Sequence, residues 1–233
     1  NVLDFVLEPL ASAYSVLDEN ERQLGVILID IGGGTTDMIV YHETGVLHAG
    51  AVPLGGHNIT YDIAYGVQTT IEQAEKLKCQ YGSAKSAMAD PEENITITGT
   101  SGRDTKNISK KRLAEIIEPR MEEIFKLIKN EIRKSDYLGE YTFGIVLTGG
   151  GSQLEHVSDL AQEIFHLPIK IGKPQLSGGV SEKVNTPRYA TGVGLINYGK
   201  NNWKEQEYAK TGNIPTIVKQ SFNKMGNFIK NWY

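Results

Sequence analysis

The segment Asp30-Ile31-Gly32-Gly33-Gly34-Thr35-Thr36-Asp37 directly follows an apolar run, residues 25–29, that is typical of a buried strand. Three consecutive glycines let the backbone turn tightly and let its N–H groups approach an anion with no side chain between them. The hydroxyls of Thr35 and Thr36 add two further donors. Asp30, at the expected end of the strand, can hold a Mg²⁺-bound water. The segment therefore predicts a phosphate-binding turn.

A second glycine turn, Leu147-Thr148-Gly149-Gly150-Gly151-Ser152, ends an expected strand at 144–148 and precedes an expected helix at 153–165. Backbone N–H groups at a helix N-terminus form a natural anion site. Neither turn matches the P-loop or the dinucleotide fingerprint. Either could be a tight turn and nothing more, but two of them at the ends of buried strands favour a shared ligand.

Hydrophobic spacing and glycine punctuation predict a mixed α/β chain. Strands 25–30, 38–41 and 46–54 form an antiparallel meander, because short glycine turns join them. Further strands are expected at 95–98, 144–148 and 168–171, and helices at 3–17, 58–67, 70–81, 109–134, 153–165 and 187–198. Ser109 is a plausible N-cap of the longest helix.

Composition excludes some classes of protein. The net charge of −4 argues against a nucleic-acid partner, which usually requires a basic surface. The single cysteine, Cys79, has no partner for an internal disulfide and fits a reducing compartment. No apolar run approaches the length of about 18 residues that a membrane-spanning helix needs.

The last segment, 215–233, has an amphipathic pattern. Its apolar stripe consists of Val218, Phe222, Met225, Ile229 and Trp232, and Lys219, Lys224 and Lys230 flank that stripe. Six lysines and two glutamates make the chain from Gly199 onward basic, whereas the rest is acidic. This pattern predicts a helix that lies in a membrane surface and contacts lipid. The alternative is a helix docked on the protein itself or in a coiled coil.

The two glycine turns resemble motifs of one superfamily, which includes actin, DnaK-type chaperones and sugar kinases. Asp30–Asp37 resembles its second phosphate motif, and Leu147–Ser152 resembles its adenosine motif. Glu8–Ala13 and Ala190–Gly194 resemble the two connecting helices, in the expected order.

Two longer segments, Pro53–Ala64 and Ala74–Gly82, are similar to the FtsA family within that superfamily. The resemblance implies lobe II of an actin/DnaK-type (ribonuclease H-like) ATPase fold, with a mixed sheet flanked by helices. The implied parts are a core at 1–54 and 141–199, an inserted smaller α+β subdomain at 55–140, a linker at 200–214 and the amphipathic helix at 215–233.

The resemblance also implies a site for ATP and Mg²⁺. Asp30 would hold the Mg²⁺ through water, Glu8 would orient the attacking water, and Glu75 and Lys78 would contact ribose and adenine. The alternatives are a helix-terminal acid for Glu8 and an exposed ion pair for Glu75 and Lys78. The implied nucleotide-binding residues are Asp30, Gly32, Gly33, Gly34, Thr35, Thr36, Gly55, Gly56, Glu75, Lys78, Gly149, Gly150, Gly151 and Ser152.

Members of the FtsA family are actin-like cell division proteins, so the resemblance implies self-assembly into a protofilament and contact with other divisome proteins. It implies that 55–140 receives the C-terminal tail of FtsZ, and that the protein anchors the FtsZ ring to the inner face of the cytoplasmic membrane at the division site. ATPase activity is expected to be weak or absent. Since the first phosphate motif is expected upstream of residue 1, this chain alone should be inactive. The alternatives are a PilM-type pilus-assembly adaptor, a sugar or acetate kinase, and a DnaK-type chaperone.

Overall fold

The computed structural model describes residues 4–43, 45–99, 105–134, 143–175 and 184–210. The chain separates into two units, 1–195 and 196–233, and each is considered by itself.

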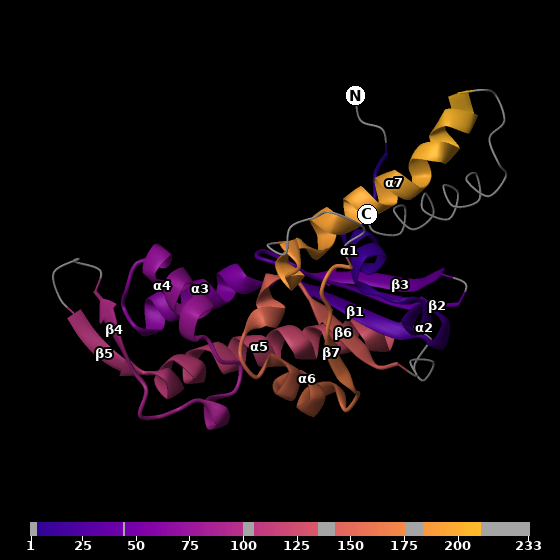
Figure 1. Cartoon of the computed structure of the whole chain (residues 1–233). Coiled ribbons are helices and arrows are strands. Elements are labelled where there is room, and N and C mark those ends of the chain that lie inside the picture. Colours follow the sequence, from indigo (N-terminus) through magenta and orange to yellow (C-terminus); the bar gives the residue numbers. More distant parts are fainter. Residues whose placement is uncertain (1–3, 44, 100–104, 135–142, 176–183, 211–233) are drawn as a thin grey trace. The chain divides into compact units, whose positions relative to one another are not determined.

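A five-stranded mixed sheet forms the centre of the first unit (Figure 1). The strand order is β3 (Gly45–Val52), β2 (Thr36–His42), β1 (Val26–Ile31), β6 (Ile145–Thr148) and β7 (Ile169–Ile171). β1, β2 and β3 are antiparallel neighbours, which confirms the predicted meander. β6 and β7 continue the sheet parallel to β1. The predicted α/β class with a mixed sheet is therefore confirmed.

β1 is buried along its whole length, because helices cover both faces of this sheet. Side chains alternate along a strand, so Val26 and Leu28 pack with α1 (Glu8–Val16) and the start of α7 (Ala190–Lys210). Ile27, Ile29 and Ile31 belong to the larger cluster on the opposite face, with α5 (Lys110–Lys134) and α6 (Val157–Phe165).

A second group of elements follows the meander: α3 (Gly56–Gly66), α4 (Ile71–Tyr81), a 3₁₀ turn (Ser86–Met88), and the antiparallel pair β4 (Asn94–Thr98) and β5 (Thr105–Ser109). The Ser109 hydroxyl accepts the N–H of Arg112 at 3.2 Å, as expected of the N-cap of α5. The larger hydrophobic cluster runs through α5 from the sheet into this group. The division at 55–140 remains a prediction.

The hydrophobic pattern of the sequence does not predict two elements, because both are short. α2 (Glu19–Leu24) begins with a capping box, in which Asp18 and Glu21 bond each other's backbone N–H. The spacing of these two acids is the signal that could have identified it. β5 is mostly exposed or half-buried and lacks an apolar stripe.

Three predicted boundaries are wrong. The first helix begins at Glu8 rather than at 3, with Pro9 in its first turn, where a missing N–H costs nothing. A 3₁₀ turn, Gly150–Gln153, follows β6, and α6 begins only at Val157. α7 continues to Lys210 through the expected linker.

The sequence favours a linker at this point because Gly199, Asn201 and Asn202 are weak helix formers. No proline interrupts α7, and the Lys, Glu, Gln and Ala residues that follow are strong helix formers, so the helix continues. Among the described helices, none has both the length and the apolar character needed to cross a membrane. The expected amphipathic helix, 215–233, lies outside the described residues.

Candidate nucleotide-binding site

The two glycine turns meet at one edge of the sheet. β1 and β6 are parallel neighbours, so their carboxyl ends lie together, where ligands of α/β proteins commonly bind. Gly149 has a φ of +81°, and a Cβ there would lie 2.3 Å from Asp30 Oδ1 and 2.6 Å from the Ile31 carbonyl oxygen. Only glycine permits this contact between the turns.

The loop before α3 packs against the first turn. The Gly56 N–H donates to the Gly32 carbonyl oxygen at 2.9 Å, and the His57 N–H donates to that of Gly33 at 2.8 Å. A Cβ on Gly55 would lie 2.7 Å from the Gly32 oxygen. Gly55 and Gly56 therefore support the turn and fix its shape.

Gly34 and Gly150 differ from these buried glycines. A Cβ on either would meet no described atom within 4 Å, and neither has a positive φ. The protein's own packing therefore does not require glycine at these two positions. Open space over exposed backbone is what an anionic ligand needs for close approach.

The Asp30 carboxylate is nearly buried, with 6% of the residue exposed. Its Oδ2 accepts a hydrogen bond from Ser12 Oγ at 2.5 Å and one from Thr191 Oγ1 at 3.3 Å. Burial raises the pKa of Asp30, the two hydroxyls lower it, and the charge of Asp37 raises it, so that the pKa lies above its ordinary value overall.

Two further carboxylates lie near this site. Burial raises the pKa of Glu8, and the charges of Asp37 and Asp30 raise it further. Burial also raises the pKa of Asp37, although a hydrogen bond from Thr35 opposes this shift. The carboxylates of Glu8, Asp30 and Asp37 thus lie close enough for repulsion between them to raise pKa values. A bound cation would relieve this repulsion.

These acids fit Mg²⁺ bound through water. Magnesium commonly keeps several waters and uses one or two carboxylates together with the phosphates of its nucleotide. No group of three His, Cys, Asp or Glu side chains in the described part of the chain could hold a metal ion by itself. Asp30 is the acid at the meeting point of the two turns, which suits the water-mediated role.

Some expected donors are engaged within the protein. The Thr36 hydroxyl is buried and donates to the Leu54 carbonyl oxygen at 2.9 Å, so it does not face the turn. The Thr35 hydroxyl donates to Asp37 Oδ2 at 2.9 Å, and the Gly32 N–H to the Thr35 carbonyl oxygen at 2.9 Å. The expectation that both threonine hydroxyls are available to a phosphate is therefore corrected. Thr36 starts β2 with its side chain directed into the protein, and Thr35 already donates to Asp37.

The second turn requires a similar correction. Ser152 is buried, and its hydroxyl donates to the Gly149 carbonyl oxygen at 2.8 Å. The turn is a 3₁₀ turn rather than the start of an α-helix, because the Ser152 N–H also bonds Gly149. The N–H groups of this segment therefore belong to a short turn. They lack the added dipole that a long helix would contribute at its N-terminus.

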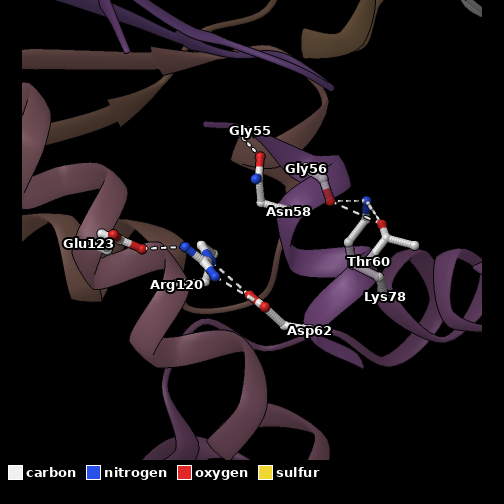
Figure 2. Close-up of polar contacts among 8 residues, drawn as sticks. All are labelled: Gly55, Gly56, Asn58, Thr60, Asp62, Lys78, Arg120 and Glu123. Carbon is white, nitrogen blue, oxygen red and sulfur yellow. Dashed lines mark hydrogen bonds and ion pairs between the residues drawn. The ribbon is translucent and has the colours of Figure 1, made fainter. Parts of the chain in front are cut away.

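Lys78 reaches back to the Gly55–Gly56 loop and the first turn of α3 (Figure 2). Its Nζ donates to the Gly56 carbonyl oxygen at 2.9 Å, to Thr60 Oγ1 at 2.8 Å and to Glu75 at 2.7 Å. These three acceptors match the three protons of the ammonium group. Lys78 thus ties α4 to the start of α3, and a contact with nucleotide would replace one of these bonds.

Glu75 is better placed to meet a ligand, since its side chain is 45% exposed. Burial raises its pKa, but hydrogen bonds from Lys78 and Thr60, together with the charge of Lys78, lower the pKa overall. Glu75 therefore stays ionised and can accept hydrogen bonds from a hydroxylated ligand. The exposed Cys79 thiol also donates to Glu75, at 3.4 Å.

The structure identifies three residues that the sequence reasoning missed. Ser12 and Thr191 hold Asp30, and Asn58 accepts the Gly55 N–H at 3.0 Å. Their segments were recognised as motifs, yet nothing local distinguishes Ser12 from Ser15 as the partner of Asp30. Only the packing of α1 on the sheet decides which hydroxyl reaches the carboxylate.

Arg120 joins α5 to α3 beside this region. Its guanidinium pairs with both carboxylate oxygens of Asp62, at 2.7 and 3.1 Å, and with Glu123 (Figure 2). A two-point Arg–carboxylate contact fixes orientation as well as distance. It therefore holds α3 in a defined position relative to α5.

In a comparison with protein families, residues 27–194 match the family described as cell division protein FtsA. FtsA of Pseudomonas aeruginosa is 44% identical over 196 residues, which cover 84% of this chain and 47% of that protein. The chain spans about half the length of the curated relatives it matches.

Solved structures show the same fold at lower identity. MreB5 of Spiroplasma citri bound to ADP has a TM-score of 0.69 at 20% identity, over 86% of this chain and 60% of that one. A PilM–PilN type IV pilus biogenesis complex has a TM-score of 0.62 at 20% identity, over 85% of this chain and 52% of that one. Both likenesses concern the fold alone.

Proposed function

The chain belongs to the FtsA family of cell division proteins, and from that premise we propose that it binds Mg²⁺-ATP and links FtsZ to the membrane. The observation that carries the ATP proposal is the meeting of two open glycine turns beside the Asp30 carboxylate. In this proposal, the backbone at Gly33 and Gly34 binds phosphate, and the turn at Gly149–Gly151 lies on the adenosine side.

The remaining roles follow from the same arrangement. Glu75 accepts hydrogen bonds from the ribose, and Glu8 orients a water for attack. Magnesium, when bound, neutralises phosphate charge. The ATPase activity of the protein is proposed to be weak or absent, and this chain alone, which spans about half the length of its curated relatives, is proposed to be inactive.

The FtsZ tail is proposed to bind within 55–140. Two large aromatic residues, Tyr61 and Tyr65, lie one turn apart on α3 and are 60% and 89% exposed. Aromatic side chains are enriched at the energetically important centres of interfaces. The salt bridge of Asp62 with Arg120 keeps the helix that carries them in place.

A labelled FtsZ tail peptide tests this proposal by fluorescence anisotropy, without ATP and on the chain as it stands. We expect micromolar binding, and a loss of about tenfold for Tyr65→Ser, which is the effect of removing one interface anchor. Val46→Ser is the control, because Val46 is an exposed apolar residue of β3 outside this region. The FtsZ proposal fails if the peptide shows no binding at about 100 μM, a concentration well above the micromolar dissociation constant expected of a transient adaptor.

The membrane part of the proposal concerns 215–233. The lysine-flanked apolar stripe would lie in the inner surface of the cytoplasmic membrane at the division site, and the actin-like body would assemble into protofilaments with other divisome proteins. The support is the amphipathic pattern of the sequence together with family membership.

A further inference from the structure

Two helices that are distant in sequence meet at one oxygen of Asp30. Ser12 on α1 donates to Oδ2 at 2.5 Å, and Thr191, the second residue of α7, lies 3.3 Å from the same oxygen. The two hydroxyl oxygens are 2.9 Å apart. Ser12 is fully buried and Thr191 is half-buried, so the bond from Ser12 to Asp30 is shielded from water. The two hydroxyls supply one proton each, so Ser12 donates to Asp30 while Thr191 donates either to Asp30 or to Ser12, and the three side chains form one hydrogen-bonded triad.

The backbones of the same two helices are in close contact beside this triad. A Cβ on Gly194 would lie 1.8 Å from the Ala11 carbonyl oxygen. The Ser15 hydroxyl donates to the Ala190 carbonyl oxygen at 2.7 Å. These contacts fix the distance between α1 and α7 and so keep both hydroxyls within reach of Asp30.

The two oxygens of Asp30 have different surroundings. Oδ2 accepts both hydroxyls, whereas no described side chain donates a hydrogen bond to Oδ1. Oδ1 lies 2.3 Å from the position that a Cβ on Gly149 would take, and therefore faces the paired glycine turns. One oxygen is held by the helices and the other is directed to the candidate nucleotide site.

We propose that Ser12 and Thr191 are positioning residues, which orient the Asp30 carboxylate toward a Mg²⁺-bound water and couple nucleotide occupancy to the crossing of α1 and α7. This inference rests on the proposed binding of Mg²⁺-ATP. Partners that orient a metal-binding group alter metal affinity without touching the metal. Coupling is reciprocal, so a change at the helix crossing alters nucleotide affinity, and nucleotide alters the crossing.

The first experiment measures ATP affinity by calorimetry, with Mg²⁺ and with EDTA, on a protein that spans the full length of its curated relatives. Thr191→Val removes the hydroxyl at constant size, and Thr191→Ser keeps it. We expect Ser12→Ala and Thr191→Val to weaken Mg²⁺-ATP binding by about tenfold, the usual effect of losing such a partner. ATP affinity in EDTA should change by less than about twofold, and Thr191→Ser should resemble the unmodified protein.

The second experiment measures amide hydrogen exchange in α1 and the first turns of α7, without nucleotide. Thr191→Val should exchange faster there than Thr191→Ser, because the hydroxyl of α7 is lost from the triad only in the former. If the unmodified protein binds no ATP, the proposed function is wrong, and exchange alone then decides whether the triad joins the helices. Equal exchange in the two variants, or unchanged Mg²⁺-ATP affinity in both Ser12→Ala and Thr191→Val, would overturn the inference.

Discussion

Individual glycines of the candidate site have different physical reasons for being glycine. At Gly55 and Gly149 a Cβ would collide with the backbone or with Asp30, so the fold itself excludes other residues. At Gly34, by contrast, a Cβ would meet no described atom within 4 Å. Substitutions can therefore separate the requirement of the fold from the requirement of the ligand.

Gly34→Asp should leave the melting temperature nearly unchanged and weaken ATP binding by more than about tenfold, roughly 1.4 kcal/mol, because it adds bulk and like charge next to phosphate. Calorimetry on a full-length protein measures the affinity. Gly55→Ala is the matched control and should lower stability, since its Cβ would lie 2.7 Å from the Gly32 oxygen. Unchanged ATP affinity in Gly34→Asp would remove this turn from the site.

The buried acid Asp30 makes stability depend on pH. Its folded-state pKa lies above the unfolded value, so between these two values the folded protein binds more protons than the unfolded chain. Stability therefore falls as pH rises through this window, which begins at the ordinary pKa of Asp, about 4. Without nucleotide, Asp30→Asn should raise the melting temperature at pH 7, and the gain should shrink as pH falls toward 4.

Thermal denaturation at several pH values measures this effect, and a stabilisation of 1 kcal/mol corresponds to a shift of about 2–4 °C for a chain of this size. Ser158→Ala on α6 provides a pH-independent reference. An Asp30→Asn variant that is less stable than the unmodified protein at pH 7 would show that the hydroxyl contacts outweigh burial.

At the scale of secondary-structure elements, the contact of α1 with α7 depends on small residues. Gly194 is buried against the Ala11 carbonyl group, whereas Gly192, only two residues earlier, is exposed, and a methyl group there would meet no described atom within 4 Å. The two glycines share one helix and differ only in the side they face. They form a natural pair for a stability measurement.

Gly194→Ala should destabilise the protein by several kcal/mol, because the backbone of α1 must move to admit the methyl group. Gly192→Ala should instead stabilise it by up to about 1 kcal/mol through better helix propensity. Urea denaturation measures both. Similar effects of the two variants would contradict the close approach of these helices.

At the scale of the whole molecule, the basic tail should confer membrane binding that the acidic remainder of the chain lacks. Trp232→Glu should abolish most co-sedimentation with liposomes, because it places a charge in the apolar stripe. Lys224→Glu should weaken binding only to anionic vesicles, since each lysine contributes at most about 1 kcal/mol there. High salt should reproduce that loss.

The competing arrangement, in which the helix docks on the protein, predicts different results. Trp232→Glu would then lower the melting temperature, and both proteins would remain at background in the sedimentation assay. If the unmutated chain stays in the supernatant with anionic liposomes, the membrane interpretation is wrong.

The amino-acid sequence by itself determined the meander and both glycine turns, because these depend on local chemistry: apolar runs, glycine freedom and chain order. It also identified the FtsA family from Pro53–Ala64 and Ala74–Gly82. It missed α2 and β5, and it ended the last helix of the body too early, since helix propensity near Gly199 is weak while the following residues restore it.

Only the tertiary structure decided which atoms of the site have partners. Thr36 and Ser152 carry suitable hydroxyls for a ligand, yet strand alternation and a 3₁₀ turn direct both into the protein. The Asp30 triad was equally invisible, because Ser12 and Thr191 lie on helices that only the packed sheet brings together. Local pattern specifies which chemistry a segment can offer, and long-range packing determines which of those groups remain available to a ligand.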